Sequence, residues 1–118
     1  MIEAIKMFFN IRDEIIPNKN TEYFEKYLYR NHIITSANIE ELYGAAIYHD
    51  EIRAVALLNL YVREHNIKIN KRSVIENIFW AYAREKYNKG LELGYRSEFV
   101  YCKQVESKYY ERYYDIFQ

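Results

Sequence analysis

The sequence predicts an all-α fold of five to seven helices, stacked as antiparallel helical hairpins in a helical bundle or a short α-solenoid. Three observations lead to this prediction. Helix breakers are scarce, with one proline and three glycines among 118 residues. Apolar residues recur at helical spacing, and no segment alternates clearly between apolar and polar residues. Half of the residues are hydrophobic, which is enough for one folded domain over residues 1–118.

The first two predicted helices are separated by Pro17, which stops the first helix near Ile16. Asn20 or Thr21 can cap the second helix. The apolar face of the first helix, interrupted by Arg12, consists of Ile5, Phe8, Phe9, Ile15 and Ile16. The inner side of the second consists of Phe24, Tyr27 and Leu28.

The third and fourth predicted helices meet near residue 50. Ser36 or Asn38 can start the third helix, and Asp50 can cap the fourth, which runs to about Glu64. The third helix contains Leu42, Ala45 and Ala46. The stretch "AVALLNLYV" in the fourth is apolar on nearly every side, so we expect it to be buried on several faces.

Two further helices complete the prediction. The fifth has the capping-box pattern Ser73–Glu76, and it ends at Gly90 or breaks near Lys86. Ser97 can cap a last helix. Its residues at helical spacing are Phe99, Cys102, Val105, Tyr109, Tyr113 and Ile116.

Two segments of the chain are similar to each other. "IEAIKMFFNIRDEII" at 2–16 and "IEELYGAAIYHDEIR" at 39–53 share isoleucines and acidic residues, and a weaker match begins at Ile75. Spacings of this length are typical of stacked helical hairpins, with units at 2–38, 39–74 and 75–118. Chance similarity between amphipathic helices is the alternative.

Residues 66–86, "NIKINKRSVIENIFWAYAREK", resemble the helical-hairpin repeats of the tetratricopeptide and pentatricopeptide class. The matches in residue type are Ile67-Lys68, Ile78-Phe79, Ala81-Tyr82 and Arg84. Ile69 stands where the family has proline, and Lys86 where it has glycine. A pentatricopeptide unit would imply that Asn77 occupies the base-reading position, with Glu41 as its equivalent in the preceding window.

Charge and cysteine content limit the class of protein. Lysine plus arginine equals aspartate plus glutamate, so the formal charge is zero and the basic excess of a dedicated nucleic-acid binder is missing. Cys102 is the single cysteine, which excludes an internal disulfide and indicates a reducing compartment. We find no signal peptide or membrane span, and therefore expect a cytoplasmic protein without a membrane partner.

No motif predicts catalysis, a metal or another cofactor. His32, His49 and His65 lack the spacing of metal ligands. Cys102 lies on an apolar stripe, which is typical of a buried thiol. His49-Asp50-Glu51 could serve acid–base chemistry, but a polar corner between two helices explains it more simply.

Two surfaces are candidate binding sites. A basic region carries Trp80 and Tyr87 close by, and it could bind nucleic acid by phosphate contacts and stacking. Its residues are Lys68, Lys71, Arg72, Arg84, Lys86 and Lys89. The C-terminal "KYYERYYDIFQ" places Tyr110, Tyr114 and Phe117 on a partly exposed arc, a candidate partner-binding or self-association face. Tyr109, Tyr113 and Ile116 are expected to point inward.

These observations favour a non-catalytic protein–protein interaction module, with self-association as a homodimer among its forms. Fourteen tyrosines fit an interface, although a preference for AT-rich codons also explains them. That codon preference is common in viruses, phages and some archaea and low-GC bacteria, and a small inhibitor or adaptor of this kind, such as a phage or viral protein, could act on a host complex. The alternative is a nucleic-acid-binding protein that uses residues 68–89.

Overall fold

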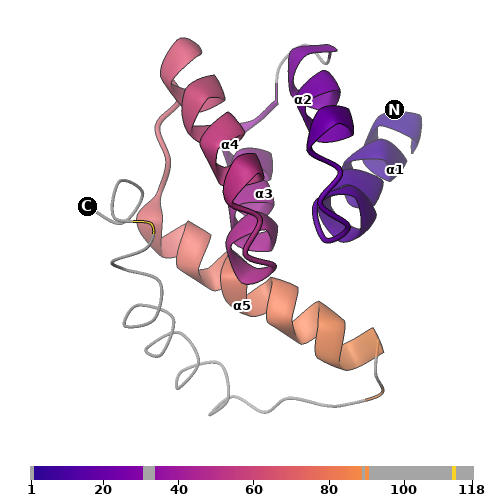
Figure 1. Ribbon diagram of the computed structural model, residues 1–118. Helices are drawn as coiled ribbons and strands as arrows, with labels where there is room; N and C mark the ends of the chain where they lie inside the picture. Colours follow the sequence, from indigo (N-terminus) through magenta and orange to yellow (C-terminus); the bar gives the residue numbers. More distant parts are fainter. Residues whose placement is uncertain (1, 31–33, 89, 91–112, 114–118) are drawn as a thin grey trace.

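The chain is all-α, as predicted. The computed structural model describes residues 2–30, 34–88, 90 and 113, and these contain helices and turns with no strand. The described residues form five α-helices, a number within the predicted five to seven (Figure 1). In chain order the elements are α1 (Ile2–Asn10), a π-helical segment η1 (Ile11–Ile15), α2 (Thr21–Arg30), α3 (Ser36–Tyr48), α4 (Ile52–Glu64) and α5 (Lys71–Asn88).

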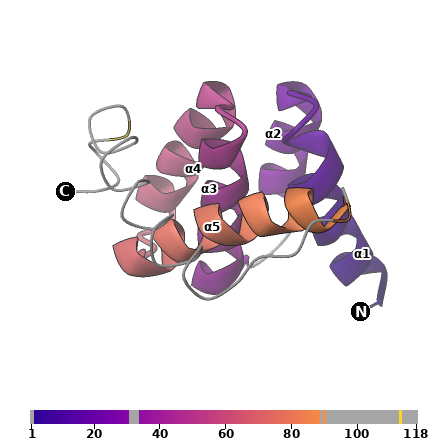
Figure 2. The same ribbon diagram turned by 90° about the horizontal axis from the view of Figure 1, so that it is seen from below.

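The central element is α3, which packs against α4, α5 and η1. A short turn at 49–51 joins α3 and α4 into a helical hairpin, and α2 packs against α4 and η1. Figure 2 shows α2, α3 and α4 standing side by side with α5 running across them. This arrangement buries α3 on several sides. The largest fully buried side chains are Ile11, Ile16, Phe24, Leu28, Ile39, Leu42, Tyr43, Ile47, Leu58, Val74 and Ile78.

The backbones of α3 and α5 approach each other closely at Gly44. A Cβ atom at this position would lie 2.5 Å from both the carbonyl carbon and the Cβ of Asn77. Because real Cβ atoms do not come so near to a backbone, Gly44 permits a crossing that any other residue would push apart. Asn77 itself is half-buried, and its Nδ2 donates to the Ser73 carbonyl at 2.9 Å. The position that a pentatricopeptide unit would use for base reading therefore lies at a helix contact.

The predicted start of α3 is confirmed, but the cap of α4 lies one residue beyond the predicted one. Helix α3 begins at Ser36, one of the two predicted starts, and Thr35 caps it, with its hydroxyl accepting from the Asn38 N–H at 3.2 Å. Glu51 caps α4 instead of Asp50, through a 3.2 Å bond from the Arg53 N–H. Each of these segments offers adjacent residues whose side chains can accept a hydrogen bond from a free N–H group at the helix start. The sequence alone does not decide which of them does so.

Asparagine caps the other two helices whose first turn carries a side-chain bond. Asn20 accepts from the Tyr23 N–H at 3.2 Å, which confirms one of the two predicted caps of α2. Asn70 accepts from the Ser73 N–H at 3.2 Å, so α5 begins at Lys71 and the predicted start at Ser73 is wrong. The Asn70 N–H in turn donates to Oε2 of the buried Glu40 at 2.7 Å. A carboxylate from α3 therefore fixes the start of α5.

Three helical segments end with the same backbone motif. Lys19, Asp50 and Asn66 have φ values of 59°, 56° and 52°, in the left-handed region. The N–H of the residue after each one bonds to a carbonyl five residues earlier, namely that of Ile15, Ala46 or Val62. This is the Schellman pattern, which glycine usually makes. Without glycines the sequence gives little warning of these turns.

The first helix differs from its prediction in two ways. It changes from α to π geometry after Asn10, and the Ile16 N–H bonds to the Ile11 carbonyl at 3.0 Å. Phe8 and Ile16 are buried as expected, but Ile5 and Phe9 are 54% and 46% exposed. The predicted single apolar face is therefore only partly covered by the described residues.

Two other predictions have mixed outcomes. In α4, Leu58 and Tyr61 are buried, but Leu60 is 42% exposed, so the all-round apolar pattern overstated the burial. Tyr113 points inward as predicted and is buried. Its hydroxyl donates to Asp50 Oδ1 at 2.9 Å. The predicted last helix lies outside the described residues, apart from Tyr113.

Candidate interaction surface

The predicted C-terminal contact residues, Tyr110, Tyr114 and Phe117, lie outside the described residues. The surface that the structure does describe is formed by α5, η1 and α1. It contains part of the predicted basic region, together with Trp80 and Tyr87.

The structure separates the predicted basic residues. Lys68 lies in the loop before α5, and Lys71 and Arg72 lie in its first turn, all three exposed. Arg72 makes an ion pair with Glu76 at 3.5 Å. Arg84, about three turns further along α5, instead points toward η1.

Lys86 and Lys89 are the last two members of the basic region. Lys86 lies about 200° around α5 from Arg84. Its Nζ lies 5.5 Å from the centroid of the Tyr82 ring, within range of a cation–π contact. Lys89 lies outside the described residues. On α5, Lys71, Arg72 and Lys86 therefore lie within about 100° of one another, whereas Arg84 lies on another side of the helix.

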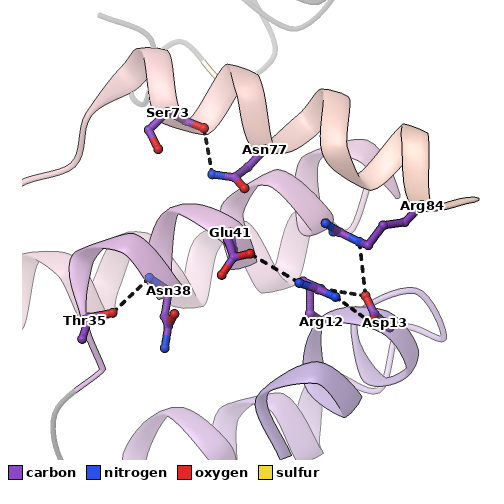
Figure 3. Close-up of polar contacts among 8 residues, drawn as sticks. All are labelled: Arg12, Asp13, Thr35, Asn38, Glu41, Ser73, Asn77 and Arg84. Atoms are coloured by element: carbon purple, nitrogen blue, oxygen red, sulfur yellow. Dashed lines mark hydrogen bonds and ion pairs between the residues drawn. The ribbon is translucent and has the colours of Figure 1, made fainter. Parts of the chain in front are cut away.

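Arg12 of η1 is the centre of a polar network (Figure 3). Its guanidinium makes two hydrogen bonds to the Asp13 carboxylate, at 2.8 and 2.9 Å, and a third to Glu41 Oε1 on α3 at 3.3 Å. Arg84 extends from α5 toward the same carboxylate, with 3.4 Å between its Nε and Asp13 Oδ1. Asp13 therefore connects two guanidinium groups from different helical elements.

The pKa values of the two arginines shift in opposite directions. For Arg12, burial acts to lower the pKa, but the hydrogen bonds and charges of Asp13 and Glu41 outweigh it, and the pKa is raised. For Arg84, burial and repulsion by Arg12 lower the pKa, and Asp13 and Glu41 offset this only in part. The charge of Arg84 is therefore the less well compensated.

Aromatic side chains border this network on both sides. Phe9 of α1 lies under Arg12, with 4.8 Å from the guanidinium carbon to the ring centroid. On α5, Trp80 and Tyr87 are 49% and 78% exposed. Because they are seven residues apart, they share one side of α5, which we call the α5 aromatic face. Exposed aromatic surface next to a charged pair is typical of a protein-binding site.

The sequence missed the network of Arg12, Asp13 and Glu41. One signal was present, since Arg12 interrupts an otherwise apolar stripe. A charged residue in such a position needs a partner when it is buried, but the sequence does not say which segment provides that partner.

The His49-Asp50-Glu51 segment is the corner between α3 and α4, and each residue has a local contact. The His49 ring packs edge-on against Tyr48, with 4.9 Å between centroids. Asp50 accepts the Tyr113 hydroxyl, and Glu51 caps α4. Burial lowers the pKa of His49, with Arg84 acting in the same direction and Glu85 and Asp13 acting against it.

Among the described residues, no three His, Cys, Asp or Glu side chains come together so that they could hold a metal ion. None of the helices in the described part of the chain combines the length and apolar character needed to cross a lipid bilayer.

Comparisons with protein-family models, with curated proteins and with solved structures found no match to this chain.

Proposed function

We propose that this protein is a non-catalytic protein–protein interaction module. The observation that carries the proposal is the exposure of Trp80 and Tyr87 on one side of α5, beside the network of Arg12, Asp13 and Arg84. Large aromatic residues and arginine supply much of the binding energy in protein interfaces. A small adaptor or inhibitor that a phage or virus directs at a host complex is the role that fits such a module.

Nucleic-acid binding by residues 68–89 is less well supported. A phosphate backbone is bound by several cations along one track, each of which displaces counterions. Here Arg84 faces η1, Lys86 lies over Tyr82, and Arg72 is paired with Glu76. The zero formal charge of the chain adds no long-range attraction.

Affinity capture with matched variants tests the proposal. The full-length protein is immobilised and exposed to an extract of its native host, beside Trp80→Ala/Tyr87→Ala. Tyr23→Ala/Leu60→Ala is the control, because these side chains are 44% and 42% exposed on α2 and α4. We expect a discrete set of proteins to be lost with the first variant and kept with the control. The same proteins on all three baits would contradict the proposal.

Self-association and nucleic-acid binding have their own measurements. Size-exclusion chromatography with light scattering compares the wild type with Tyr110→Ala/Tyr114→Ala, and a monomer in both would exclude the homodimer.

Fluorescence anisotropy with RNA and DNA at two salt concentrations tests the alternative, nucleic-acid binding. Binding that falls steeply with salt and is lost in Lys71→Glu/Arg72→Glu would favour the nucleic-acid function instead.

A further inference from the structure

The Arg84 guanidinium is only partly used by the protein itself. In the described part of the chain it has one ion pair, from Nε to Asp13 Oδ1 at 3.4 Å, and no hydrogen bond. Its side chain is 29% exposed. An arginine carries five N–H donors in a planar fork that matches a carboxylate. The two terminal nitrogens of Arg84 therefore have donor capacity to spare at a half-buried position.

Asp13 cannot satisfy Arg84 fully, because it is already bound to Arg12. Both carboxylate oxygens of Asp13 accept hydrogen bonds from Arg12, at 2.8 and 2.9 Å. Glu41, the other nearby acid, bonds to Arg12 as well. Burial and the charge of Arg12 together outweigh these two acids at Arg84, as the lowered pKa indicates. One further carboxylate would improve its electrostatic environment.

The surroundings of Arg84 suit a peptide. Trp80 lies one turn before Arg84 and Tyr87 one turn after it, so the three residues share one side of α5, and both aromatic residues are exposed. Glu85, the other acid on this turn, lies about 100° around the helix from Arg84. The site thus offers two apolar surfaces with one cation between them.

We propose that Arg84, together with Trp80 and Tyr87, binds an acidic segment of a protein partner. A carboxylate of the partner accepts two hydrogen bonds from the terminal nitrogens of Arg84, and an apolar or aromatic neighbour packs on the exposed rings. This inference rests on the proposed interaction function and specifies the chemistry of the partner. Charge complementarity selects the occupant, since one half-buried fork fits one carboxylate, whereas a nucleic-acid backbone needs a row of exposed cations.

Selection from a display library of random twelve-residue peptides tests the inference. The full-length protein is the bait, and peptides that bind are resynthesised with each Asp or Glu replaced by Asn or Gln. We expect the selected pool to be enriched in an acid next to an aromatic or large aliphatic residue. Because a charge-assisted hydrogen bond is about twice as strong as a neutral one, we expect the amide versions to bind about tenfold more weakly.

Variants of the protein separate this inference from the proposed function. Arg84→Gln should remove the difference between acid and amide peptides, while Arg72→Gln on the same helix should keep it. Circular dichroism confirms that each variant is folded, and the peptide substitutions give the same information without altering the protein.

A selected peptide pool without acidic enrichment, or equal binding of acid and amide peptides, would overturn the inference. If Trp80→Ala/Tyr87→Ala loses partners and Arg84→Gln does not, the interaction function stands and the acidic partner is excluded. Tighter binding of a twelve-nucleotide RNA than of any peptide would overturn both.

Discussion

Helices α1 and α3 begin with similar sequences but have opposite environments. Ile5 in α1 is 54% exposed, whereas Leu42, its counterpart in α3, is fully buried. Glu3 is exposed, whereas its counterpart Glu40 is buried and holds the N–H of Asn70. The same local pattern therefore gives an edge helix in one place and the central helix in another.

The number of packing partners explains this difference. α3 packs against α4, α5 and η1, while α1 mainly contacts η1, the segment that continues it. Apolar spacing determines whether a helix has a face to bury. It does not determine how many neighbours the fold supplies, and an uncovered face is then available for another molecule.

The first prediction compares the matched pair of apolar residues directly. Leu42→Ala should lower the free energy of unfolding by about 3 kcal/mol, because it leaves a cavity in the core. Ile5→Ala should change it by less than about 0.5 kcal/mol, since the side chain is mostly in solvent. Urea unfolding followed by circular dichroism measures both. Similar losses for the two variants would show that α1 is packed as well as α3.

The second prediction tests why α3 is central. Gly44→Ala should lower the free energy of unfolding by about 2.5 kcal/mol, because the new Cβ would collide with the Asn77 backbone. The sign is informative, since alanine is otherwise better than glycine in a helix by about 1 kcal/mol. Ser36→Ala, at an exposed position of α3, is the control in the same urea experiment. A stabilised Gly44→Ala protein would contradict the close crossing.

The third prediction compares the buried Glu40 with an exposed glutamate of α2, Glu22. Glu40→Ala should cost about 2 kcal/mol of stability, because the N–H of Asn70 loses a charged acceptor at 2.7 Å. Hydrogen exchange of that amide should speed up correspondingly. Glu22→Ala is the control, since Glu22 is 86% exposed and its ion pair with Lys26 is worth less than about 0.5 kcal/mol. Unchanged exchange at Asn70 would remove the proposed role of Glu40.

The smallest effect is expected at the turn that follows η1. Lys19 has a φ of 59°, a conformation that is unfavourable for a residue with a Cβ. Lys19→Gly should therefore raise the free energy of unfolding by about 0.5 kcal/mol, after the greater flexibility of glycine in the unfolded chain is subtracted. Thermal and urea unfolding check it. A clear loss of stability would indicate that the lysine side chain contributes more than the turn does.

The sequence was sufficient for the all-α fold because breakers are rare and helical spacing is regular. It missed the caps Thr35, Glu51 and Asn70. Thr35 and Glu51 each stand next to another residue that can cap, Ser36 and Asp50, and Asn70 lies three residues before the capping-box pattern at Ser73. The sequence also missed the π-helical turn that carries Arg12, and the left-handed turns made without glycine.

The candidate site was only partly predictable for a different reason. Trp80, Tyr87 and Arg84 were singled out from residue type, but as part of a basic stripe that the structure divides. The contact of Arg84 with Asp13 joins helical elements far apart in the sequence. A single sequence contains no information about which distant charges come together, so the ion pair between Arg84 and Asp13 could not be predicted from it.

The central claim is that the α5 aromatic face contacts a protein, and site-specific photo-crosslinking tests it most directly. A benzophenone amino acid replaces Tyr87, which is 78% exposed, or Tyr23 on α2, which is 44% exposed, and each protein is irradiated in the cells of its native host. Our account predicts a discrete protein adduct from position 87 that is absent from position 23 and is reduced by Trp80→Ala. Equal adducts from the two positions, or adducts at position 87 to nucleic acid alone, would contradict it.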